Sequence, residues 1–178
     1  MTSNITGRRR LAGKWGVAVL TAAIAMVPGG SMLRASAAEN WHAIEGVWLV
    51  QVQLRICATG APLGPPFSSV VTFHPGGTIS EGTANRAFAP GQRTDAQGVW
   101  ETLGHGAYSQ RMVSLIAFST DPNLPTTPGF LEGWQVVEQT VESTDADHMT
   151  SSGTNAFYRT DGTVYRTGCS TAIGTRFK

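Results

Sequence analysis

Cysteine is scarce in this sequence, with only two among 178 residues. A disulfide-dense scaffold needs several pairs, and a zinc site held mainly by thiolates needs more sulfur ligands than two. Both classes are therefore excluded. What two cysteines do permit, in an exported chain, is one structural disulfide, between Cys57 and Cys169.

Helical periodicity and catalytic motifs are also missing. No stretch of ten residues after position 40 repeats its apolar residues at helical spacing. There is no Gly-x-Ser-x-Gly elbow, and no His and Asp stand at a recognisable spacing. Gly76-Gly77 lies between two expected strands rather than before a helix, so it is not a phosphate-binding loop. We expect no cofactor.

The N-terminal segment has the pattern of a secretory signal peptide. Arg8-Arg9-Arg10 and Lys14 precede an uncharged run, Trp15 to Val27, and small residues follow at Ala35 to Ala38. The run is shorter than the roughly twenty residues needed to span a bilayer. We therefore assign residues 1–38 to a signal peptide, exported by the general route or by a twin-arginine route, and expect a secreted or periplasmic protein.

Removing this segment changes the charge of the protein. Five of the thirteen basic residues lie in it and none of the twelve acidic ones, which leaves eight against twelve and a net charge of −4. Nucleic-acid binding then has no electrostatic basis. Residues 39–178 are enough for one domain with a core. We expect this domain to be monomeric and without a membrane span.

The stretch that opens with Glu45-Gly46-Val47-Trp48 reads as a half-buried strand. Apolar residues fall on every second position, with Gln51, Gln53 and Arg55 between them. They are Trp48, Val50, Val52, Leu54 and Ile56.

The end of the chain, Thr163 to Phe177, is the expected antiparallel partner of that strand. Pairing Trp48 with Arg176 gives a residue sum of 224, and pairing Cys57 with Cys169 gives 226, so one register nearly satisfies both. The first pair predicts a cation–π contact contributing roughly 0.5 to 2 kcal/mol. The alternative is that Gly-x-Trp occurs here by chance and that the register match is a coincidence.

Short alternating runs separated by Gly, Pro and Asp predict eight strands. Asp161-Gly162 predicts a two-residue type I′ turn before the last. The first, third and fifth connections are long and the even ones short, which predicts an all-β, up-and-down antiparallel barrel with one elaborated mouth and one closed base. The predicted strands are Trp48 to Cys57, Ser68 to His74, Thr78 to Ala84, Gly98 to Leu103, Ala107 to Phe118, Phe130 to Ser143, His148 to Thr160 and Thr163 to Phe177.

A meander that begins Gly-x-Trp and ends with an Arg near that Trp resembles the lipocalin and calycin superfamily. Phe73-His74-Pro75-Gly76-Gly77-Thr78, Gly98-Val99-Trp100 and Gly168-Cys169-Ser170-Thr171 look like segments of small exported bacterial lipocalin-like proteins without an assigned activity. The resemblance implies that Trp48 and Arg176 are the structural pair that closes the base.

The leading functional hypothesis is a barrel that binds a small apolar or amphipathic molecule inside. The fifth strand carries Tyr108, Met112, Ile116 and Phe118 on one face, interleaved with Gln110 and Ser114. The alternative is a packed core without a cavity. Candidate ligand-binding residues are Val52, Leu54, Phe67, Phe88, Trp100, Tyr108, Met112, Ile116 and Trp134, with Leu124 as a further loop residue at the mouth.

Two other functions stay open. A cofactor-free isomerase or cyclase would need an inward acid, for which Glu132, Glu138 or Tyr108 is the candidate; the glutamate face of the sixth strand points either inward or to solvent, and we favour solvent. A protein-binding or inhibitor module would use the Pro-rich loop Asp121 to Gly129. The histidines, His42, His74, His105 and His148, carry no spacing that fixes a metal site, and we expect none.

Overall fold

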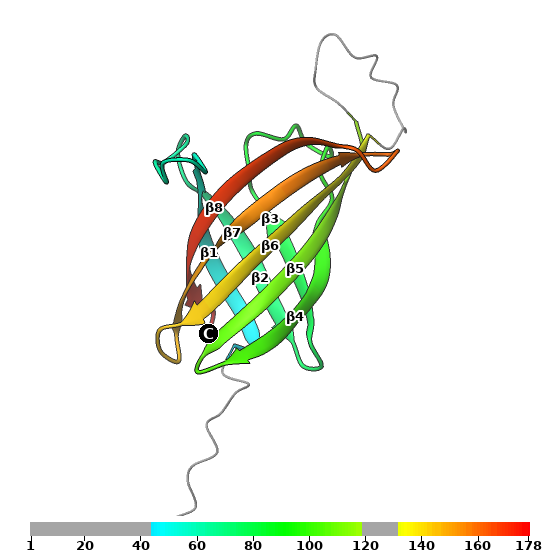
Figure 1. Cartoon of the computed structure of the whole chain (residues 1–178). Helices are drawn as coiled ribbons and strands as arrows, with labels where there is room; N and C mark the ends of the chain where they lie inside the picture. Colours follow the sequence, from blue (N-terminus) through cyan, green and yellow to red (C-terminus); the bar gives the residue numbers. More distant parts are fainter. Residues whose placement is uncertain (1–43, 119–131) are drawn as a thin grey trace, which may run out of the picture. The chain divides into compact units, whose positions relative to one another are not determined.

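The computed structural model describes residues 44–118 and 132–178, and this part of the chain is all-β. Eight antiparallel strands pair in sequence order, and the last pairs with the first, so the sheet closes into a barrel (Figure 1). The predicted fold class is confirmed. The strands are β1 (Gly46–Arg55), β2 (Phe67–His74), β3 (Thr78–Thr83), β4 (Ala96–Gly104), β5 (Ala107–Ile116), β6 (Gly133–Ser143), β7 (His148–Arg159) and β8 (Val164–Arg176).

The observed strand ends differ from the predicted ones by a few residues. β1 ends at Arg55 rather than Cys57, because the chain then folds back and the Leu63 amide donates to the Leu54 carbonyl. β4 begins at Ala96, before the predicted Gly98. The predicted start of the sixth strand, Phe130, lies outside the described residues.

The turn before β8 is tight, as predicted, but it is not type I′. Of Asp161 and Gly162, only the glycine has positive φ, at +84°. The amide of Gly162 donates to the Arg159 carbonyl, and the Asp161 carboxylate accepts from the Thr163 amide at 2.8 Å. The aspartate therefore supports the turn through its side chain rather than through a left-handed backbone.

A guanidinium and an indole close the base of the barrel, as the sequence predicts. The guanidinium carbon of Arg176 lies 4.3 Å from the centroid of the Trp48 ring. Arg176 also donates to the carbonyls of Glu45, at 2.5 Å, and of Ala146, at 2.7 Å. Gly46 is required beside this pair, because a Cβ there would stand 2.7 Å from an Arg176 nitrogen and its φ is +127°.

One constant register joins β1 to β8, from Trp48 opposite Arg176 to Arg55 opposite Cys169. Cys57 lies just beyond the end of β1 and forms the predicted disulfide with Cys169, with 5.2 Å between their Cα atoms. The two-residue discrepancy in the predicted register is thus explained: Cys57 reaches Cys169 from outside the ladder, and Arg55 occupies the paired position.

Aromatic side chains fill the lower half of the interior. Trp100 meets Phe73 and Tyr108 edge to face, with ring centroids 6.1 and 5.8 Å apart. The indole nitrogens of Trp48 and Trp100 donate to the carbonyls of Ile44 and His74, so both buried polar groups are satisfied. We call this layer the aromatic floor.

The two ends of the barrel differ as the loop lengths predict. The β2–β3, β4–β5 and β6–β7 turns lie with the C-terminus at the floor end, while loops 56–66 and 84–95 lie at the opposite end with the β7–β8 turn (Figure 1). The third long loop, 119–131, lies outside the described residues. Among the described connections, the long ones therefore lie at the mouth, together with the tight β7–β8 turn, and the base has only short ones.

Candidate functional site

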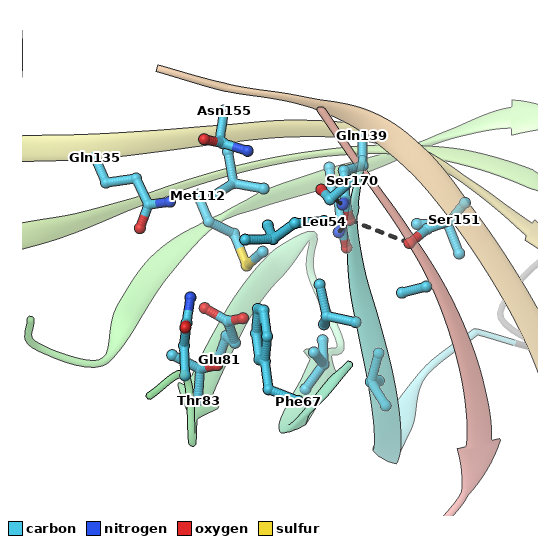
Figure 2. A pocket seen from close by; sticks show the side chains of 18 of the residues that line it. Leu54, Phe67, Glu81, Thr83, Met112, Gln135, Gln139, Ser151, Asn155 and Ser170 are labelled. Atoms are coloured by element: carbon cyan, nitrogen blue, oxygen red, sulfur yellow. Dashed lines mark hydrogen bonds between the residues drawn. The ribbon is translucent and has the colours of Figure 1, made fainter. Parts of the chain in front are cut away.

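A cavity of about 60 Å³ runs from above the aromatic floor toward loop 84–95. Alternate residues of nearly all the strands point into it, because successive side chains of a strand face opposite sides of the sheet. Figure 2 shows the labelled side chains converging on this space from different strands. We call it the interior cavity.

The interior cavity is amphipathic in cross-section. β1 and β2 contribute only apolar side chains, namely Val50, Val52, Leu54, Phe67 and Val71. β5 to β8 contribute polar groups between apolar ones, namely Gln110, Gln135, Gln139, Ser151, Asn155 and Ser170. We call the first group the apolar wall and the second the polar wall.

Hydrogen bonds order the lower part of the polar wall. The Gln139 carbonyl oxygen accepts from the Gln110 amide at 2.6 Å and from the Ser151 hydroxyl at 3.1 Å. The Gln139 amide donates to Ser170 at 3.0 Å. One network of side-chain hydrogen bonds joins four strands in this way.

One acceptor of the polar wall has no protein partner. Gln110 is 6 % exposed, and its Oε1 is buried without a hydrogen bond. Thr83 Oγ1, at the end of β3, is in the same state and also lines the interior cavity. A buried polar atom left unpaired costs roughly 1–3 kcal/mol, so such atoms are expected to bind water or a ligand.

A buried ion pair stands at the upper edge of the interior cavity. Arg93 Nη2 lies 2.7 Å from Glu81 Oε2, and the two side chains are 5 % and 11 % exposed. Arg93 Nε donates to Gln135 at 2.7 Å, and the Ser69 hydroxyl donates to the other Glu81 oxygen at 2.9 Å. The two charges neutralise each other and each has a further polar partner.

Loop 84–95 brings Arg93 to this position by following the end of β5. The Thr94 amide donates to the Leu115 carbonyl, and the Gln92 side chain, 6 % exposed, donates to the Phe118 carbonyl at 3.0 Å. Phe88 from the same loop lies 6.2 Å from Phe157 of β7, measured between ring centroids. The loop is thus fastened on both sides of the mouth.

The predicted ligand-binding residues other than Trp134 fall into three groups. Five of them line the interior cavity: Val52, Leu54, Phe67, Phe88 and Met112. Three are buried but are not part of its lining, namely Trp100 and Tyr108, which belong to the floor, and Ile116 near the mouth. The predicted loop residue Leu124 lies outside the described residues.

Trp134 is a correction, because it lies on the outer face of the sheet. Its neighbours Gln135 and Gly133 are both buried, and its ring stacks on Tyr158 with centroids 5.5 Å apart and an interplanar angle of 9°. The next inward positions of β6 are Val137, Gln139 and Val141.

The predicted catalytic carboxylates do not line the interior cavity. Glu138 pairs with Arg111 at 2.7 Å on the outer face, with side chains 56 % and 66 % exposed. Glu132 precedes β6 and is absent from the lining. Burial raises the pKa of the Tyr108 phenol, and a backbone hydrogen bond with Ile44 opposes that shift. Tyr108 is therefore a neutral floor residue.

Several residues of the site were not singled out from the sequence. Glu81 and Thr83 occupy the inward positions of β3 after Ile79, and this alternation was the available signal for them. Arg93 comes from a loop, where no alternation exists. Gln110 was visible as a polar residue within the inward row of β5.

The described residues form neither a metal-ligating cluster nor a helix able to cross a membrane. Within 44–118 and 132–178, no three His, Cys, Asp or Glu side chains gather as a metal site. His42 lies outside these ranges. In the same ranges no helix has the length and apolar character to cross a membrane.

The fold and the site define a class, a closed eight-stranded barrel with an amphipathic interior cavity. No family model matches this chain, and no curated protein or solved structure matches it significantly.

Proposed function

We propose that this chain is an exported, lipocalin-like, monomeric barrel that binds a small amphipathic molecule in its interior cavity. The observation that carries the proposal is the opposition of the apolar and polar walls around one space, with an unpaired acceptor at Gln110. Small-molecule sites combine an apolar lining with a few polar groups that orient the ligand. The disulfide fits an exported protein, secreted or periplasmic.

The volume of the cavity limits the size of the ligand. A water molecule needs about 10–15 Å³ on this measure, so about 60 Å³ corresponds to roughly five non-hydrogen atoms. The best small ligands gain about 1.5 kcal/mol per such atom, which sets a ceiling near 7.5 kcal/mol and a dissociation constant of about 3 µM. A long lipid chain would have to displace Met112 or loop 84–95.

Native mass spectrometry of the protein purified from its own host tests this proposal. We expect a small molecule at up to one equivalent, released on denaturation and identified by its mass. A protein that remains empty in its host and also binds no small amphipathic probe would contradict the proposal and favour the packed-core interpretation.

Filling the cavity with a larger side chain is a second test, and a substitution on the outer face is its matched control. Ala172 lines the interior cavity, while Thr175 is exposed on the same strand. We expect Ala172→Leu to lose the bound molecule and Thr175→Leu to retain it. Equal occupancy of the two variants would place the ligand elsewhere on the protein.

An enzymatic function is not favoured by the described residues. Its predicted acids are outside the interior cavity, and Glu81, the carboxylate that does line it, is already bonded to Arg93 and Ser69. The protein-binding alternative rests on loop Asp121 to Gly129, which lies outside the described residues.

A further inference from the structure

The charged side chains that line the interior cavity neutralise each other. Glu81 and Arg93 are the charged side chains among its described lining residues, and they are paired at 2.7 Å. The remaining polar groups are amides and hydroxyls. The cavity thus offers no uncompensated charge to a ligand.

In the polar wall, Gln110 uses its amide nitrogen in a hydrogen bond and leaves its side-chain oxygen free. Gln139 Oε1 accepts hydrogen bonds from both the Ser151 hydroxyl and the Gln110 amide nitrogen. Gln110 Oε1 is left buried and unpaired. Gln110 Oε1 therefore requires a hydrogen-bond donor from the ligand. A ligand group that can only accept hydrogen bonds leaves this oxygen unpaired.

We infer that the interior cavity selects an uncharged ligand that carries an O–H or N–H donor on a short apolar chain, such as a small alcohol or primary amide. This inference rests on the proposed function and names its ligand class. The donor binds Gln110 Oε1, and the chain lies against the apolar wall. Carboxylates are excluded twice, because they are charged and because their ionised form has no donor.

Alkylammonium ions are disfavoured for a different reason. They carry donors, but burying an unpaired ammonium costs far more than the hydrogen bond with Gln110 returns. Glu81 does not offset that cost, since its charge is already neutralised by Arg93 at 2.7 Å. Ketones of the same size are uncharged, but they have no donor and so leave Gln110 Oε1 without a partner.

A matched set of four-carbon probes separates these cases on the unaltered full chain. The probes are 1-butanol, 2-butanone, butyrate and butylammonium at neutral pH. The ¹³C-labelled methyl groups of Met112 and Met149 report binding, because both side chains line the interior cavity. We expect 1-butanol to shift these signals with the lowest dissociation constant, about three- to tenfold below that of 2-butanone, and at least tenfold below those of the two ions.

Gln110→Met tests the assigned acceptor, because methionine has a similar size and no strong acceptor. We expect the dissociation constant of 1-butanol to rise about five- to tenfold, and that of 2-butanone to change less than twofold. Gln97→Met is the matched control, since Gln97 is exposed on β4. The probe ranking on the unaltered protein remains decisive even if Gln110→Met does not fold.

The outcomes separate this inference from the proposed function. If none of the probes shifts the Met112 or Met149 methyl signals, both fail. If 2-butanone or butyrate binds as tightly as 1-butanol, the cavity binds small molecules but the donor requirement is wrong. An unchanged butanol affinity in a folded Gln110→Met protein would also overturn it.

Discussion

Arg93 is the residue that connects the mouth loop to the interior of the barrel. Its guanidinium bonds to Glu81 of β3 and to Gln135 of β6, and it lies 5.9 Å from the Phe88 ring. Both members of the ion pair are nearly buried. Removing one member therefore leaves the other as an uncompensated charge in a place that water reaches poorly.

The Glu81–Arg93 pair predicts strongly non-additive substitutions. We expect Glu81→Gln or Arg93→Met alone to lower the free energy of unfolding by about 3–5 kcal/mol, and the double variant to lose much less than the sum. Urea unfolding of the unaltered protein, the two single variants and the double variant measures this coupling.

The exposed pair Arg111 and Glu138 is the matched control. It has the same 2.7 Å separation on the outer face, and its coupling should fall within about 0–1 kcal/mol. Additive losses at Glu81 and Arg93 would show that the buried pair is more solvated than its burial implies.

Residues differ in how much of their role the sequence reveals. Trp48 and Arg176 could be paired because both lie in alternating strands and the cysteine pair indicates nearly the same register. Arg93 could not be paired with Glu81, because a loop has no periodicity from which the direction of a side chain follows. Gln110 showed its inward face but not its free oxygen, which depends on Gln139 and Ser151 from two other strands.

At the scale of elements, β6 shows why strand faces are harder to assign than strands. Both of its faces carry apolar and polar residues, so alternation alone did not choose between them. The register with β5 decides: Tyr108 stands opposite Val141, Gln110 opposite Gln139, and Met112 opposite Val137. Directly opposed residues of neighbouring strands share a face. The β6 residues opposite the inward residues of β5 therefore also point inward, and Trp134 points to the outer face.

Close approach of neighbouring strands is a second property of the elements. A Cβ on Gly98 of β4 would overlap the Arg111 carbonyl oxygen and stand 2.7 Å from the Met112 Cα. In the sequence, Gly98 was noted only as part of the segment Gly98-Val99-Trp100. The backbone of β5 is the actual reason for it, because β4 and β5 could not come this close over a side chain.

The close approach of β5 to Gly98 predicts that alanine cannot replace this glycine without loss of stability. We expect Gly98→Ala to lower the free energy of unfolding by about 2–3 kcal/mol, because backbone rather than a flexible side chain must move. In Gly82→Ala, on β3, the new methyl group would meet only Asp95 Oδ1 at 3.5 Å, an ordinary contact, and stability should change by less than about 1 kcal/mol. Similar losses in the two variants would contradict this explanation, and urea unfolding distinguishes them.

The whole molecule depends on the closure of β1 against β8. These strands lie at opposite ends of the described sequence, yet eight residue pairs join them in one register. The same junction carries the disulfide, at a sequence separation of 112. The fold was predictable at this scale because the Trp48–Arg176 pair and the cysteines both point to one alignment, whereas the volume of the cavity depends on side-chain packing across all the strands.

Removing the disulfide tests how much closure owes to the covalent link. Since the noncovalent junction remains, we expect Cys57→Ala with Cys169→Ala to fold into the same barrel. In the chain-entropy treatment, its unfolded state gains the freedom of a loop of more than a hundred residues, so the free energy of unfolding falls by up to about 4–5 kcal/mol. Urea unfolding with and without reductant measures the loss.

Reductant should destabilise the unaltered protein by the same amount as the double substitution does, and it should leave the double variant unchanged. A loss below about 1 kcal/mol would mean that the unfolded chain already keeps its ends together, whereas a variant without barrel structure would mean that the β1–β8 ladder cannot close the sheet alone.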